Sequence, residues 1–156
     1  MQELKDTLKH EFEMTDLGKH AYFLGIEFTE TSSGVVMHQR KYIEEVLNKF
    51  KMSQCNEAIT PVEGNLRLDN CECEELVDNT LFKQLVGCLR FICHSKPKIS
   101  YGVGLVSRFM KNPKHSHLAA AKRILRYRKG TINDGIIFPY QKAKGEMSLA
   151  AYSDSD

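Results

Sequence analysis

The sequence LFKQLVGCLRFIC, residues 81–93, decides the fold of this 156-residue chain. Its apolar residues recur at spacings of three and four, the pattern of a helix with one buried face. They are Leu81, Phe82, Leu85, Val86, Leu89, Phe91 and Ile92. The stretch predicts an amphipathic helix that packs against other helices of the chain.

This helix opens a region of unusual charge. Residues 81–129 carry twelve cations and no carboxylate, whereas residues 61–80 carry one cation and six acids. Exposed helices usually mix both signs, so a block without acids is uncommon. It is either a polyanion-binding face or a solvated helical surface. If four to six cations reach phosphates, log affinity falls against log salt with a slope of about −4 to −5.

Two more helices are predicted in the basic region, which gives a three-helix bundle over residues 81–130. One begins at Pro97 and ends at residues 112–113; the other covers residues 115–129, with Gly130 as its C-cap. Residues 132–140 and 147–152 then predict two strands joined by a polar turn. A lone two-stranded hairpin is marginal in water, so we expect these strands to be loosely held.

The chain before the basic region is more varied. Residues 2–12 predict a helix that a break at residues 15–18 ends, and residues 41–50 predict another. Between them, residues 21–29 and 34–38 predict a β-hairpin with a loop of about five residues. Residues 53–80 are polar, acidic and aperiodic, which is typical of a linker. The predicted fold class is α+β, with units at residues 1–52, 81–130 and 131–156 around the linker.

Composition excludes several classes of protein. The sequence has no run of eighteen apolar residues and no apolar core of a signal peptide, so we expect an intracellular protein, cytoplasmic or nuclear, with no membrane partner. Five cysteines without a Cys-x-x-Cys motif indicate reduced thiols. Cys71, Cys73, Cys93 and His94 match no zinc spacing. His115 and His117 are better explained as capping or surface residues than as metal ligands.

Several strings resemble one known family when they are taken in order. They are FEMTDLG (12–18), FLGIE (23–27), QRKYI (39–43), TP (60–61), QLVGCL (84–89), SRFM (107–110), AAKRILRY (120–127), KGT (129–131) and the terminal YSDSD (152–156). The series closely resembles the reverse transcriptase of copia-type (pseudoviral) LTR retrotransposons, encoded in a Gag-Pol polyprotein. SKPKI (95–99) departs from an Arg-Pro-Asp-Ile-like string, and Arg128 replaces an expected leucine.

The resemblance implies the C-terminal part of a reverse transcriptase that runs into the start of a ribonuclease H domain. Its parts would be the end of a palm with a primer-grip-like hairpin, a thumb-like helical bundle and the first strands of a ribonuclease H sheet. The polymerase aspartates of the family lie in a Tyr-Val-Asp-Asp-like string, which this chain lacks; they hold two metal ions, Mg²⁺ in the parent enzyme. Asp154 resembles the first metal-binding aspartate of ribonuclease H. We therefore expect no complete catalytic site and no cofactor in this chain.

The resemblance also implies contact with a template–primer duplex. Phe23, Leu24 and Gly25 resemble the primer grip, where a glycine lets a phosphate come close; a plain hairpin glycine is the alternative. Residues 81–93 resemble the first thumb helix, which lies in a minor groove. Its candidate contacts are Lys83, Gln84, Gly87, Arg90 and Phe91. The alternative is that Phe91 is core and Gly87 only lets two helices pack closely.

The last predicted helix offers a second basic face at Lys122, Arg123, Arg126 and Lys129, although cations in its last turn also complement the helix dipole. The expected function is that of a polymerase fragment that contacts template–primer nucleic acid beside the rest of the polyprotein. The alternatives are a non-catalytic nucleic-acid-binding remnant and a degenerate open reading frame without activity.

Overall fold

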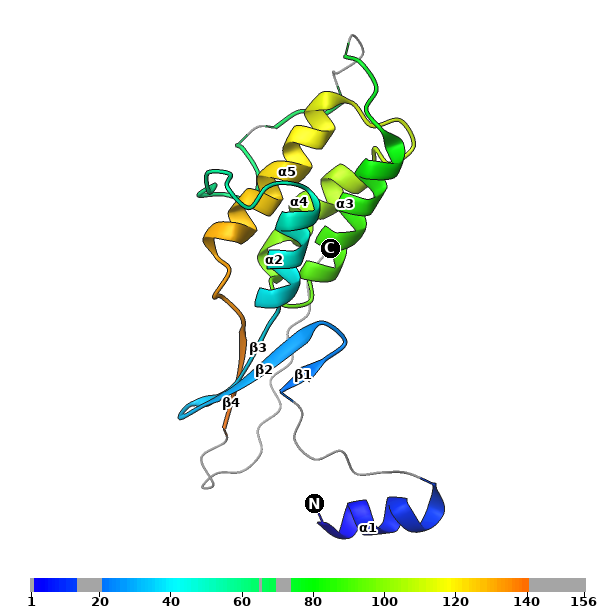
Figure 1. The fold of residues 1–156 in the computed structure, drawn as a ribbon, viewed down its shortest axis with the longest axis vertical. Coiled ribbons are helices and arrows are strands. Elements are labelled where there is room, and N and C mark those ends of the chain that lie inside the picture. Colours follow the sequence, from blue (N-terminus) through cyan, green and yellow to red (C-terminus); the bar gives the residue numbers. More distant parts are fainter. Residues whose placement is uncertain (1, 14–20, 65, 70–73, 141–156) are drawn as a thin grey trace, which may run out of the picture.

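The computed structural model describes residues 2–13, 21–64, 66–69 and 74–140. The fold is α+β, as expected: a group of helices packs together, and a four-stranded antiparallel sheet of order β1-β2-β3-β4 lies at one end of it (Figure 1). An N-terminal helix, α1 (Gln2–Glu11), precedes the sheet, and its described side chains are exposed. The predicted break at residues 15–18, the strand at residues 147–152 and Asp154 lie outside the described residues.

The predicted hairpin is present with a tighter turn. It consists of β2 (Ile26–Thr31) and β3 (Gly34–His38), joined by residues 32 and 33 alone. The expected loop of about five residues is wrong, because Glu30 pairs with Val35 and Thr31 pairs with Gly34. A short strand, β1 (Tyr22–Phe23), pairs with the start of β2 and adds a second turn to this sheet.

The strand after the helices joins the same sheet. β4 (Ile136–Pro139) is shorter than the predicted strand and runs antiparallel to β3. Val35 lies opposite Phe138 and Met37 lies opposite Ile136, so apolar side chains meet across the two strands on one face. The expectation of a two-stranded terminal hairpin did not include this partner, which comes from about a hundred residues earlier in the chain.

The helices that follow the hairpin in the described residues are α2 (Arg40–Lys49), α3 (Asn79–Ile92), α4 (Ser100–Ser107) and α5 (His115–Gly130), with a 3₁₀ turn at Pro97–Ile99 before α4. Three of these helices begin and end close to the predicted positions, whereas α4 ends at Ser107 and not at the predicted residues 112–113. Asp78 caps α3 by accepting hydrogen bonds from the backbone N–H groups of Thr80 at 2.8 Å and Leu81 at 3.3 Å. Gly130 is the last residue of α5, and the C-cap is Thr131 instead.

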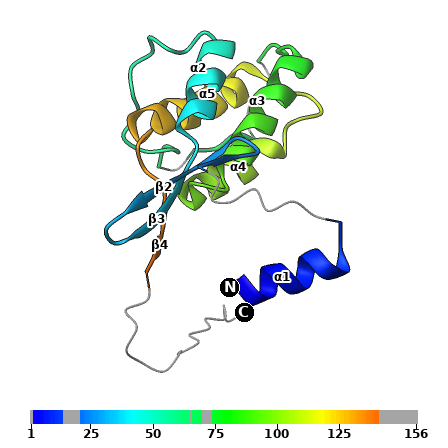
Figure 2. The same cartoon turned by 60° about the horizontal axis from the view of Figure 1, so that its bottom comes forward.

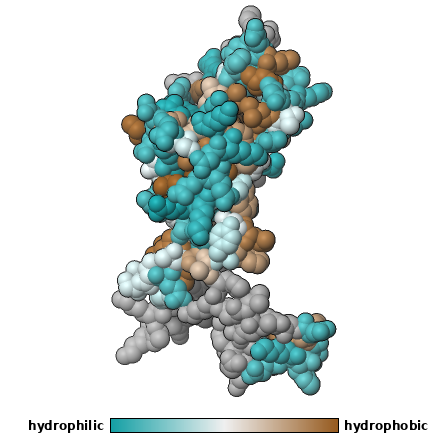
Figure 3. Space-filling model, viewed as in Figure 1, coloured by the Kyte–Doolittle hydropathy of each residue, from teal (hydrophilic) through white to brown (hydrophobic). Residues whose placement is uncertain are grey.

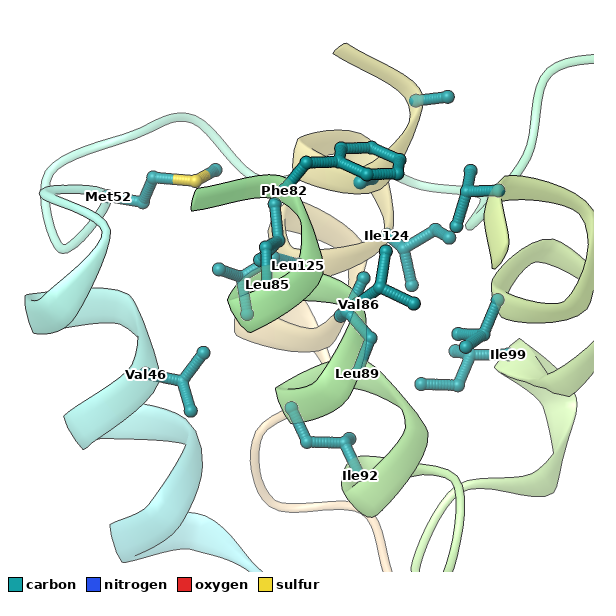
Figure 4. Close-up of a cluster of buried hydrophobic side chains, with 14 of the residues drawn as sticks. Val46, Met52, Phe82, Leu85, Val86, Leu89, Ile92, Ile99, Ile124 and Leu125 are labelled. Atoms are coloured by element: carbon teal, nitrogen blue, oxygen red, sulfur yellow. The ribbon is translucent and has the colours of Figure 1, made fainter. Parts of the chain in front are cut away.

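One core holds four helices, where the sequence predicted a bundle of three. Ile43, Val46 and Leu47 of α2 are buried together with α3 and α5 (Figure 4). Helices α3, α4 and α5 contribute Phe82, Leu85, Val86, Leu89, Ile92, Val103, Val106, Ala120, Ala121, Ile124 and Leu125, and the joining segments add Met52, Leu68 and Ile99. The apolar face of α2 needs cover that the sheet does not offer, so this helix joins the bundle.

Candidate nucleic-acid interface

The turn between β1 and β2 presents apolar side chains to solvent. Leu24 and Gly25 have φ angles of 48° and 81°, so both central residues of this two-residue turn are left-handed. That is the pattern of the hairpin turns whose twist matches the strands. Leu24 is 75% exposed and Phe23 is 58% exposed. Figure 3 shows apolar atoms at the edge of the molecule where the turn lies in Figure 1.

The polar face of α3 is open along its length. Lys83, Gln84, Gly87 and Arg90 are all exposed. A Cβ atom placed on Gly87 would have no heavy atom within 4 Å outside its own helix backbone and chain neighbours. The alternative in which Gly87 lets two helices pack closely is therefore absent from the structure. The face is free for the close approach of another molecule.

Phe91 connects the turn to α3. Its ring is half-buried, and a Cβ atom on Gly25 would lie 3.2 Å from the ring carbon Cε1. The ring of Tyr42 meets Phe91 edge-on, with centroids 4.7 Å apart. The ring of Phe91 thus packs against the turn and holds it beside α3. Less of the ring is left to contact a sugar of a bound nucleic acid.

The basic face of α5 is occupied by the chain itself. Arg123 donates to the Glu63 carboxylate at 2.7 Å, and Arg126 Nε donates to the backbone oxygen of Asn56 at 2.7 Å. Lys129 donates to the backbone oxygen of Cys55 at 2.7 Å. The acidic segment predicted as a linker therefore lies along α5, and the described part of it is fixed there. Because these three side chains already donate hydrogen bonds within the chain, they are less available to bind a ligand than the cations on α3.

Two further cations of the basic block are buried near the sheet. Lys96 pairs with Asp134, and its hydrogen bond lowers the pKa of that carboxyl. Arg128 is fully buried and donates to the backbone oxygens of Thr131 and Asp134. Burial lowers the pKa of the Arg128 guanidinium. The arginine that replaces an expected leucine is thus a structural residue.

Sequence reasoning missed several residues around the turn. Lys41 lies with its Nζ atom 5.6 Å from the centroid of the Tyr22 ring, and His94 is exposed one turn after Arg90. Gln39, which joins β3 to α2, and Ser95, in the turn after α3, form a buried hydrogen bond. For Lys41 the sequence offered a signal, because this cation is the first residue of the helix predicted at residues 41–50.

No group of three or more potential metal-binding side chains gathers among the described residues. Cys55, Cys88 and Cys93 are free thiols, while Cys71 and Cys73 lie outside the described residues. His117 is a capping residue, because its Nδ1 atom accepts the backbone N–H of Lys114 at 3.0 Å. In the part of the chain that the structure describes, no helix is long and apolar enough to cross a membrane.

Comparisons with known proteins point to one group. The model of the family described as "Reverse transcriptase (RNA-dependent DNA polymerase)" matches residues 1–64. The Retrovirus-related Pol polyprotein from transposon RE1 of Arabidopsis thaliana is 38% identical over 97% of this chain, which spans 10% of that polyprotein. The Retrovirus-related Pol polyprotein from transposon TNT 1-94 of Nicotiana tabacum is 35% identical over 98% of this chain and 12% of its own length.

A shorter relative is an uncharacterized mitochondrial protein of Arabidopsis thaliana. It is 35% identical over 96% of this chain, which spans 60% of its length. No solved structure matches the chain. The similarity thus runs through the sheet, the helices and the segment that lies along α5.

Proposed function

Because the chain belongs to the reverse transcriptases of copia-type retrotransposon Pol polyproteins, we propose that it contacts a template–primer duplex through the turn at residues 23–25 and the polar face of α3. The parent polyprotein would carry out RNA-directed DNA synthesis. The catalytic carboxylates and their Mg²⁺ ions would belong to other parts of that polyprotein, and this chain would hold the nucleic acid without cleaving or extending it.

The observation that carries the proposal is the open position of Gly87 on an exposed helix face that has cations and no acid. Lys83 and Arg90 lie one turn away on either side of Gly87 and can reach phosphates. Gln84 can donate hydrogen bonds to base edges or sugars. A duplex can approach the helix backbone most closely where no side chain intervenes.

The turn adds an apolar contact to this basic face. The exposed side chains of Phe23 and Leu24 suit the sugar and base edges at the end of a primer strand. The minor groove carries a degenerate code, so binding would show little preference for base sequence. Affinity would come from phosphate contacts, shape and the packing of the turn.

The test is the affinity of the chain for an RNA·DNA hybrid with a recessed primer end, measured by fluorescence anisotropy. We expect Gly87→Leu to weaken binding by about tenfold, since the new side chain occupies the proposed contact without a change of charge. Gly87→Ala should have a smaller effect.

The matched control is Gly64→Leu, because Gly64 also has open space around it but lies away from α3 in the sequence. It should bind like the parent. If Gly87→Leu folds normally and binds as tightly as the parent chain, the face of α3 does not contact the duplex, and the proposal fails.

A further inference from the structure

Three contacts between the sheet and the helices converge on residues 91–96, the C-terminal end of α3 and the turn after it. The ring of Phe91 lies against Gly25 in the turn between β1 and β2. The Ser95 hydroxyl donates to Gln39 Oε1 at 2.7 Å, and Lys96 pairs with Asp134 just before β4. One short stretch of chain therefore holds the sheet at several points.

Gln39 is the most deeply buried of the residues that connect the sheet to the end of α3. It is 0% exposed and lies between the last residue of β3 and the first residue of α2. Its Nε2 atom donates to the backbone oxygen of Phe91 at 3.4 Å, while its Oε1 atom accepts from Ser95. Both halves of a buried amide are thus used to hold α3.

This use of the amide is unusual for the position of Gln39. It is the N-cap of α2, yet its side chain makes no capping hydrogen bond. Glu27 of β2 instead accepts from the backbone N–H of Lys41 at 2.9 Å. Glu27 thus satisfies a free N–H group at the start of α2, and the side chain of Gln39 is left to bind α3.

The sheet has little else to hold it in place. No described residue of the four strands belongs to the buried core cluster, whose members come from the helices and the segments that join them. Figures 1 and 2 show the sheet extending from one end of the helices and not packed across them. Its orientation therefore depends on the contacts at residues 91–96 and at the junction of β3 with α2.

We infer that Gln39 is a positioning residue that fixes the turn at residues 23–25 relative to the polar face of α3, so that both meet one duplex as a single surface. This inference rests on the proposed function. When two contacts are held at a fixed spacing, binding at the first keeps the second at a high local concentration, and less freedom is lost on binding. If the hydrogen bonds of Gln39 are removed, the turn at residues 23–25 should contribute little to the binding affinity.

The experiment measures how much the turn adds to binding when Gln39 is intact and when it is changed. Affinity for the recessed RNA·DNA hybrid is measured for Leu24→Ala and Lys83→Ala, each alone and combined with Gln39→Met. In the parent background we expect losses of about threefold for Leu24→Ala and about fivefold for Lys83→Ala. With Gln39→Met, Leu24→Ala should cost nothing more, while Lys83→Ala should keep its full effect.

The control is Gln54→Met, the same exchange at an exposed position, which should leave both effects unchanged. Ser95→Ala breaks the same link with a smaller change and gives the answer if Gln39→Met does not fold. A merely structural role would leave the threefold effect of Leu24→Ala intact in these backgrounds, and that result would overturn the inference alone. If neither Leu24→Ala nor Lys83→Ala weakens binding to the parent chain, the proposed function and the inference both fall.

Discussion

Among the described residues, Leu24 and Lys51 are the non-glycine residues with a positive φ angle, and Leu24 lies in the proposed interface. At a φ angle of 48°, the Cβ atom of leucine lies too close to the backbone, which destabilises the folded state by about 1 kcal/mol. Glycine has no Cβ atom and avoids this contact. The side chain of Leu24 is nevertheless exposed, so its burial does not offset this strain. Strain at an exposed apolar residue is consistent with a side chain that serves binding and not stability.

Leu24→Asn should therefore separate stability from binding. Asparagine tolerates the left-handed region, and Asn-Gly is the preferred pair for such a turn. We expect the free energy of unfolding to rise by about 1 kcal/mol in a denaturant titration, while affinity for the primed hybrid falls about threefold. Leu76→Asn, the same exchange at an exposed leucine without a positive φ, should not raise stability.

Asp134 should make the protein sensitive to acid. The hydrogen bond from Lys96 lowers the pKa of its carboxyl in the folded state. As the pH falls, the unfolded chain therefore takes up the proton first, and the contribution of Asp134 to stability is lost below the ordinary aspartate pKa of about 4. Above that pH the contribution is fully present.

The measurement is the thermal unfolding midpoint between pH 7 and pH 3. Asp134→Asn should lower the midpoint at pH 7 and should show a smaller further drop in acid than the parent chain. An equal drop in both proteins would mean that other carboxylates account for the acid sensitivity. Asp69→Asn is a suitable control, because its carboxylate is exposed and lies 4.0 Å from Arg108.

At the scale of elements, periodicity predicts what lies within one helix but not which elements meet. The open face of α3, with Lys83 and Gly87, could be deduced from the spacing of its apolar residues alone. The contact between Gly25 and Phe91 could not, because it depends on the left-handed turn and on how the sheet meets the helices. The place of α2 in the core was missed for the same reason, since its apolar face fits several partners equally well.

For the basic face of α5, the sequence did not indicate that other parts of the chain bond to its cations. Lys122, Arg123 and Arg126 have helical spacing and no acid on their own helix, which favoured a ligand-binding surface. Arg123 and Arg126 instead bond to residues 56–63, and the Arg123–Glu63 pair joins residues sixty positions apart. A partner so far away in the sequence cannot be predicted from the residues next to Arg123. Only the charge split between the two regions could have suggested that they meet.

The pairing of β4 with β3 predicts an intermediate degree of protection for the last described strand. We expect hydrogen exchange to be slower at the β4 amides bonded to β3 than in α1, whose described side chains are exposed. It should still be faster than in α3, which lies in the core. Exchange in β4 as fast as in α1 would support the earlier expectation of loosely held strands.

Across the whole molecule, internal bonds reduce the charge that is free for a ligand. Of the twelve cations in residues 81–129, five are exposed: Lys83, Arg90, Lys98, Arg108 and Lys111. They lie on α3, in the 3₁₀ turn before α4, or at and just after the end of α4. A duplex on the polar face of α3 would meet Lys83 and Arg90 first, so we expect fewer phosphate contacts than the four to six predicted from the sequence.

We expect log affinity for the hybrid to fall against log salt with a slope of about −3, which corresponds to about three phosphate contacts. Lys83→Ala should flatten the slope by about one unit and weaken binding to all sequences alike. Lys49→Ala, on α2, should leave the slope unchanged. A slope near −5 would mean that about five cations contact phosphate, which is more than the polar face of α3 supplies.

The hydrogen bonds of Arg126 to Asn56 and of Lys129 to Cys55 join residues 70 and 74 positions apart. During synthesis on the ribosome, α2 and the segment after it emerge long before α5. Their partners are synthesised about seventy residues later, and contacts between residues so far apart in sequence form slowly. The apolar side of α2 must therefore remain uncovered until α5 has been synthesised, and we expect the nascent chain to be most prone to aggregation in that interval.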